Sequence, residues 1–167
     1  MSFQTQVYIN PAQGQPGDFA SSNPMFFQMS SSGKMVADSS GVTVGHFAII
    51  NDDGTVTSLP ASGFDVSRIG FVHREANAQI VTFLADHSYE IYPGLPVSLF
   101  AKGDFFVTAD IVNTNTRGAA ILWNITTGQT EVGGTASATL VDTGFKCVTA
   151  APTAGSTIII SRSLTAS

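Results

Sequence analysis

Three histidines, at positions 46, 73 and 87, are the side chains of this sequence best suited to bind a metal ion or act as a base. Metal sites usually take two ligands from one element at i, i+2 or i, i+4, and these histidines are 27 and 14 residues apart. The spacing favours separate roles, with His46 as a hydrogen-bonded strand residue and His73 in a polar cluster with Arg74 and Glu75. Their convergence in a small barrel enzyme is kept as an alternative.

The acidic residues offer two patterns that resemble functional sites. Asn51–Gly54 resembles the start of a calcium loop, but the segment Thr55–Phe64 contains no acid to complete it, so a turn is predicted. Asp104 and Asp110 bracket an apolar segment in the manner of a glycosidase pair. The sequence supplies neither their separation nor a raised pKa for one of them, and we interpret them as strand-end caps.

Cys147 is the single cysteine, so it can form neither an intramolecular disulfide nor a structural zinc site by itself. Its neighbours alternate as in a strand, which predicts a small core residue. The Gly-x-Ser-x-Gly elbow, the P-loop and the Gly-x-Gly-x-x-Gly fingerprint are all absent. The sequence therefore predicts a protein that is not an enzyme, with no catalytic residue, no metal and no cofactor.

The composition excludes further classes of function. Among 167 residues there are 12 acidic and 7 basic side chains, a net charge of −5, and only 11% charged residues. The basic residues are scattered singly, so no patch is available to neutralise a phosphate backbone, and nucleic acid is not an expected partner. No apolar run is long enough to cross a bilayer, and no Sec signal is visible, so we expect neither a membrane role nor export from the compartment of synthesis.

The elements that must position these residues are predicted to be strands. From Gly41 onward the sequence alternates with period two, and Val42–Ile50, the turn Asn51–Gly54 and a return strand from Thr55 form a predicted hairpin. One helix candidate, Arg74–Leu84, has a strand-like second half. The pattern predicts an all-β protein, an antiparallel barrel or a jelly-roll-like sandwich. Further strands are predicted at 68–73, 80–84, 90–92, 96–100, 105–109, 119–123, 129–132, 144–149 and 156–161.

An internal similarity divides this β region into two parts. The second occurrence of a set of turn residues lies 73 or 74 residues after the first. Two hairpins that merely share turn residues would produce part of this pattern, so both a duplication and a coincidence are left open. The matching pairs are Gly45 with Gly118, Asn51 with Asn124, Gly54 with Gly128, and Gly70 with Gly144.

Residues 1–40 form a different kind of segment from the β domain, 41–167. This segment contains Pro11, Pro16 and Pro24 and little hydrophobic periodicity, which predicts an extended N-terminal arm. Its isolated aromatic residues are anchors that a solvated tail would lack. The arm is therefore expected to pack either on its own domain or on a neighbouring molecule.

Five segments, in this order along the chain, resemble the structural cement (head decoration) proteins of tailed bacteriophages. The resemblance extends from about residue 6 to residue 132, whereas 133–167 has no match and Ile49-Ile50 stand where an aromatic residue is expected. The segments are Gly17–Pro24, Gly41–Ala48, Gly70–Glu75, Pro93–Phe100 and Gly103–Val107.

The resemblance implies a virion protein, made in the host cytoplasm, that binds the outer surface of an icosahedral head. Its implied partners are the major capsid protein and neighbouring copies of itself. The expected mechanism is the burial of surface at many repeated contacts, together with the addition of strands across the seams between capsid subunits. It implies no catalytic residue. On the argument from the arm, the predicted capsid contacts are Tyr8, Pro11, Asp18, Phe19, Pro24, Phe26 and Phe27.

An alternative of a different class is a β-sandwich module that binds carbohydrate, either free or displayed on a virion. Sugar sites use exposed Trp or Tyr side chains as stacking platforms. This sequence has one Trp and three Tyr, and Trp123 lies within a predicted hairpin strand, which favours burial.

Overall fold

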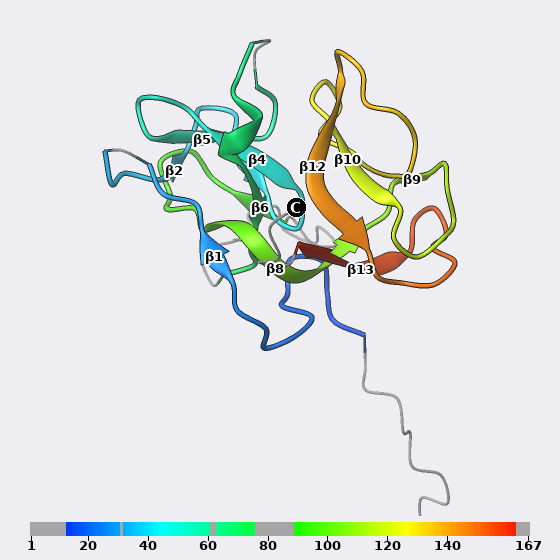
Figure 1. Ribbon diagram of the computed structural model, residues 1–167. Coiled ribbons are helices and arrows are strands. Elements are labelled where there is room, and N and C mark those ends of the chain that lie inside the picture. The colour runs from blue at the N-terminus through cyan, green and yellow to red at the C-terminus, as the bar shows by residue number, and fades with distance from the viewer. Residues whose placement is uncertain (1–12, 31, 61–62, 76–88, 163–167) are drawn as a thin grey trace, which may run out of the picture.

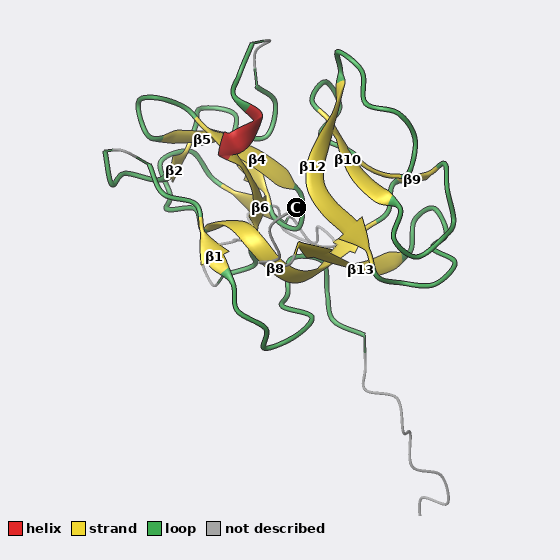
Figure 2. Ribbon diagram, viewed as in Figure 1, coloured by secondary structure: helices red, strands yellow, loops and turns green. Residues whose placement is uncertain are grey.

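The computed structural model describes residues 13–30, 32–60, 63–75 and 89–162, and within them the chain is almost entirely β structure (Figure 2). The prediction of an all-β sandwich is confirmed. No helix in these residues is long and apolar enough to cross a membrane. The one helical turn in this part of the chain is the 3₁₀ helix η1 (Val66–Arg68), which Asp65 caps by accepting a hydrogen bond from the N–H of Ser67.

Thirteen strands lie within the described residues. Two form a small separate sheet, β3 (Val42–Thr43) with β7 (Glu90–Ile91), and the others belong to one large sheet. The strands of the large sheet are β1 (Phe26–Phe27), β2 (Val36–Ala37), β4 (Phe47–Ile50), β5 (Thr55–Thr57), β6 (Ile69–Val72), β8 (Leu99–Thr108), β9 (Ile111–Val112), β10 (Ala120–Asn124), β11 (Thr130–Val132), β12 (Leu140–Cys147) and β13 (Thr157–Arg162).

The long strand β8 joins the two parts of the large sheet. Its first residues pair with β6 and β1, and Gly103–Thr108 pair with β13. Figure 1 shows the strands on either side as two lobes connected by β8. The order across the sheet is β2-β5-β4-β6-β8-β13-β12-β10-β11-β9, so β8 and β13 form the seam.

The two lobes repeat one arrangement of strands. In each, a hairpin pairs with a third antiparallel strand and, on its other side, with a short parallel strand: β4, β5, β6 and β2 in one lobe, β10, β11, β12 and β9 in the other. The third strand of each lobe also pairs with one strand of the seam: β6 pairs with β8, and β12 pairs with β13. Coincidence of turn residues does not explain a shared strand order, so the structure favours two related halves.

An aromatic core lies where the two lobes face each other. Phe47 and Phe71 from one lobe pack with Phe105 of β8 and with Phe145 and Trp123 of the other, and all five are fully buried. The ring of Phe105 lies 4.6 Å from that of Phe71 and 6.1 Å from that of Phe145, measured between centroids. Burial of this apolar surface is the main stabilising contribution at the seam.

A second core covers the opposite face of the β2-β5-β4-β6 lobe. Because side chains alternate along a strand, Phe47 and Ile49 face the aromatic core while Ala48 and Ile50 face the other way. The small sheet β3–β7 closes this side with Val42 and other aliphatic residues. This lobe is therefore buried on both faces, which explains why all four residues of β4 are buried.

Several sequence predictions are corrected in detail. The segments 96–100 and 105–109 are not separate strands, because β8 continues through Gly103, whose backbone adopts φ +141° instead of making a turn. The first predicted hairpin strand is divided between β3 and β4, which pair with different partners. The short strands β1, β2 and β9 were not predicted. The predicted strand 80–84 and most of the helix candidate 74–84 lie outside the described residues.

Replacing Phe105 with Ala should reduce the free energy of unfolding by about 3–5 kcal/mol, because the cavity would lie at the junction of both lobes. Denaturant titration measures this loss. Ile111→Ala, at an exposed position of β9, serves as the control and should change stability by less than about 0.5 kcal/mol. Similar small losses for both variants would show that the seam is not the principal core.

Candidate docking surface

The described members of the predicted contact set fall into two groups. Tyr8 and Pro11 lie outside the described residues. Asp18 and Phe19 are engaged within the chain, whereas Pro24, Phe26 and Phe27 are exposed. The structure therefore divides the predicted set into residues that attach the arm to its own domain and residues that face solvent.

The described part of the arm is hydrogen-bonded along β8. The N–H of Gly17 donates to the carbonyl of Phe106, and the N–H of Phe106 donates to the carbonyl of Asp18. Two residues on, the N–H of Ala20 donates to the carbonyl of Asp104. This segment packs on its own domain, which was one of the two possibilities for the arm.

Asp18 and Phe19 secure this attachment through their side chains. The guanidinium of Arg74 donates to both carboxylate oxygens of Asp18, at 2.8 and 3.2 Å. The ring of Phe19 stacks on His73 with centroids 4.0 Å apart and meets Phe100 edge-on at 5.3 Å. His73 Nδ1 lies 2.7 Å from the carbonyl oxygen of Gly17, which places its proton on Nδ1. The predicted cluster of His73, Arg74 and Glu75 is thus replaced by contacts with the arm.

Asp104 holds the next part of the arm. Ser21 Oγ donates to its carboxylate at 2.6 Å, and the side-chain amide of Asn23 donates to the same oxygen. Burial alone would raise the pKa of Asp104, but the hydrogen bonds of Ser161, Ser21 and Asn23 more than offset it and lower the pKa. Asp104 therefore lies inside β8 as an anchor for the arm, not as a strand-end cap.

Directly after this anchor the chain presents a row of exposed apolar side chains, which we call the docking patch: Phe26, Phe27 and Met29. Their exposed fractions are 46%, 62% and 79%. Phe26 and Phe27 form β1 against β8, and the ring of Phe27 lies 4.3 Å from that of the buried Phe100. Phe27 thus contacts the core while most of its surface faces solvent, and exposed apolar surface of this kind is typical of a protein interface.

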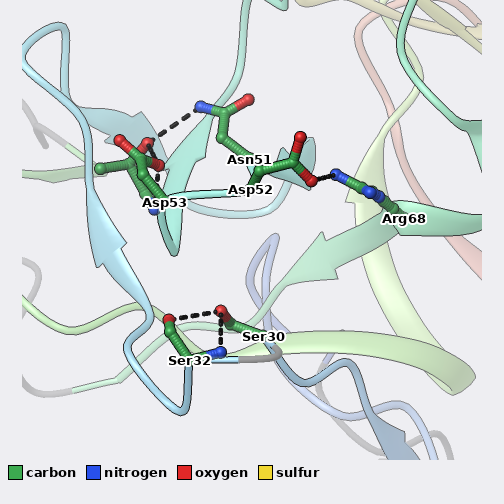
Figure 3. A network of polar contacts seen from close by, with 7 residues as sticks. Ser30, Ser32, Asn51, Asp52, Asp53 and Arg68 are labelled. Atoms are coloured by element: carbon green, nitrogen blue, oxygen red, sulfur yellow. Dashed lines mark hydrogen bonds and ion pairs between the residues drawn. The ribbon is translucent and has the colours of Figure 1, made fainter.

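A hollow of about 190 Å³ lies beside the patch, and a second hollow of about 410 Å³ adjoins the first. Both are lined by Ile50, Asn51, Asp52 and Arg68, and the smaller one also by Met29. Figure 3 shows Arg68 donating to the carboxylate of Asp52, with Ser30 and Ser32 hydrogen-bonded below. The recess next to the patch therefore combines the apolar side chains of Met29 and Ile50 with polar groups, among them the paired charges of Arg68 and Asp52.

The predicted turn Asn51–Gly54 is confirmed, and it lines this recess. Asp53 accepts hydrogen bonds from the N–H and Oγ1 of Thr55, chiefly the latter, which lower the pKa of Asp53. The carboxylate thus closes a β turn, as the sequence predicted. No local signal marked Arg68 or Ser30, because only the fold brings them to this turn.

The remaining candidates for chemistry lie apart. His46 Nε2 lies 3.7 Å from a carboxylate oxygen of Asp110, and Cys147 is buried in the aromatic core, as predicted. His87 lies outside the described residues. Within those residues no three His, Cys, Asp or Glu side chains are grouped as metal ligands.

Comparison with known proteins connects this fold to phage heads. The family model described as XM1 gp53 minor capsid protein matches residues 3–162. The chain belongs to this family of phage minor capsid proteins. It is therefore a capsid-associated structural protein of a bacteriophage virion.

A solved structure supports the fold of this minor capsid protein over nearly its whole length. A chain in "The capsid of Myoviridae Phage XM1" superposes with a TM-score of 0.64, covering 98% of this chain and 99% of that one. The two sequences are 13% identical, so the likeness concerns the fold. No curated protein matches the sequence.

Asp104→Asn should destabilise the protein at neutral pH and not in acid. Since the folded state lowers the pKa of Asp104, its stabilising contribution is present above the unfolded pKa, near 4, and is lost as pH falls through the folded pKa. Denaturant titrations of the wild type and the variant at pH 7 and about pH 2.5 measure the difference. An equal difference at both pH values would contradict a role for the charge.

Proposed function

We propose that this minor capsid protein is a decoration (cement) protein, which binds the outer surface of the assembled head and stabilises the shell. Each copy bridges subunits of the major capsid protein and contacts neighbouring copies of itself. The single observation that carries the proposal is the docking patch, an exposed apolar row fixed to the core of a protein from a capsid family. A monomer rarely exposes Phe, Phe and Met side by side without a partner.

The mechanism is the burial of apolar surface at many equivalent sites on a symmetric capsid. Ligands that bind only the assembled shell stabilise it by mass action, and each contact need be only moderately strong because many copies act together. Edge strand β1 presents backbone next to the exposed aromatic rings, which suits the addition of an extended segment from a capsid subunit. The protein acts through these contacts alone and catalyses no reaction.

The carbohydrate-binding alternative is weakened because its main candidate for a stacking platform is not exposed. Trp123, the single tryptophan, is fully buried in the aromatic core. The large exposed apolar side chains of the described residues are Phe, Met, Leu, Val and Ile, which fit a protein surface better than a sugar ring.

Phe27→Ser and, separately, Phe26→Ser should weaken binding to undecorated heads by about tenfold each, since each removes an apolar ring from the interface. Sedimentation of heads with labelled protein measures binding. Ile111→Ser, which also removes an exposed apolar side chain, should bind as the wild type does. Melting temperatures verify that the variants are folded. Wild-type binding by both Phe variants would exclude the docking patch as the contact.

Removal of residues 1–12 tests the predicted contacts Tyr8 and Pro11 while leaving the arm's attachment intact. A deletion of 1–29 would also remove Asp18 and Phe19, which the domain itself uses. We expect the shorter deletion to weaken head binding by at least about tenfold, because the arm is proposed to contribute much of the affinity. Undiminished binding by the folded deletion variant would remove the arm from the interface.

A further inference from the structure

A separate hollow of about 180 Å³ lies between the small sheet β3–β7 and the turn that joins β10 to β11. It thus lies between elements from the two halves of the chain. No Phe, Tyr or Trp is among the described residues that line it. Its polar walls are made of hydroxyl and amide side chains, namely Ser40, Thr43, Ser58, Thr127 and Gln129.

Glu90 of β7 is the acidic residue in this lining. It is half-buried, and within the described residues nothing donates a hydrogen bond to its carboxylate. Gly41 makes room for this carboxylate, because a Cβ at that position would lie 2.6 Å from Glu90 Oε1. No Lys or Arg among the described residues lines the hollow.

His46, the other ionisable side chain of the lining, already has neighbours. Its Nδ1 lies 3.3 Å from the carbonyl oxygen of Val44, and its Nε2 lies 3.7 Å from Asp110. Asp110 in turn accepts a hydrogen bond of 2.7 Å from the N–H of Thr130. Burial would raise the pKa of Asp110, but hydrogen bonds from His46 and Thr130 and the charge of His46 together lower it. Among the described residues that line the hollow, Glu90 is therefore the charged side chain without a hydrogen-bond or ion-pair partner.

We propose that this hollow is a socket for one basic side chain, a lysine ammonium or an arginine guanidinium, of a partner protein. A partly buried carboxylate without a partner favours a cation, because the pair offsets the cost of removing Glu90 from water. The hydroxyl groups and the Gln129 amide oxygen supply acceptors for the remaining N–H groups. The hollow is large enough for one side chain, and its lack of an aromatic wall disfavours a sugar.

If the partner is a capsid subunit, the inference rests on the proposed function, and the socket then selects a basic residue at a fixed distance from the docking patch. The socket itself is independent of that function. An acidic protein with a net charge of −5 attracts a basic residue at long range, and the socket is the specific site at which that residue would bind.

The test is a titration of the free, full-length protein with n-butylamine hydrochloride, and with 1-butanol as the uncharged probe of similar shape. Backbone ¹H–¹⁵N spectra follow the amides of Gly41, Gly128 and Gln129. We expect saturable shifts with the amine at about 1–10 mM, as suits a single small contact, and none with the alcohol. Glu90→Gln should weaken amine binding at least about fivefold, whereas Glu75→Gln, the same change at an exposed position that does not line the hollow, should leave it unchanged.

Three results would overturn the inference: no saturable shift of these amides in the wild type, equal amine binding by the folded Glu90→Gln variant, or saturable shifts with methyl glucoside instead of the amine. If Glu90→Gln does not fold, Gln129→Ala replaces it, with a weakening of at least about twofold expected. Because no head is present, a failure here leaves the proposed function standing, and a failure of head binding leaves the socket standing.

Discussion

The structure depends on the pairing of β8 along both of its edges. This one strand bonds to β6, β13 and β1, and residues 17–20 of the arm occupy a further stretch of it. Its buried side chains Phe100 and Phe105 also belong to the aromatic core. Because half of the residues of β8 are buried and the rest are partly buried, its backbone groups must find hydrogen-bond partners, which fixes the neighbours of β8 closely.

Gly103 makes this continuous strand possible. At φ +141° it adopts a backbone conformation that other residues avoid, and an added Cβ would lie 2.9 Å from the ring of Phe105. The strand therefore passes from one half of the molecule to the other without a turn. The two halves then face each other across one aromatic core instead of forming separate domains.

The arm shows how the same constraint produces an exposed apolar surface. Asp18, Phe19 and Asp104 hold residues 17–23 against the domain, and the chain emerges at β1 with Phe26 and Phe27 directed to solvent. Because β1 is short and bonded to β8, it cannot bury both rings on its own molecule. The exposed rings thus follow directly after an attached segment, so the proposed docking patch is already ordered before a partner binds, and little conformational entropy would be lost on binding.

The local pattern of apolar and turn residues in the sequence determined many of the strands and several of the buried positions. Alternation and turn residues located the hairpin of β4 and β5 and the burial of Trp123 and Cys147, because each depends on residues near one another in the chain. The repeated turn residues left a duplication and a coincidence equally open, and the shared strand order then favoured two related halves. Only the tertiary structure decided that 96–109 holds one strand, that Asp18 and Phe19 face inward, and that Glu90 lies beside residues near position 128. Two-residue strands such as β1 carry no periodicity, and contacts such as Asp18 with Arg74 join positions 56 residues apart, so their partners exist only once the chain has folded.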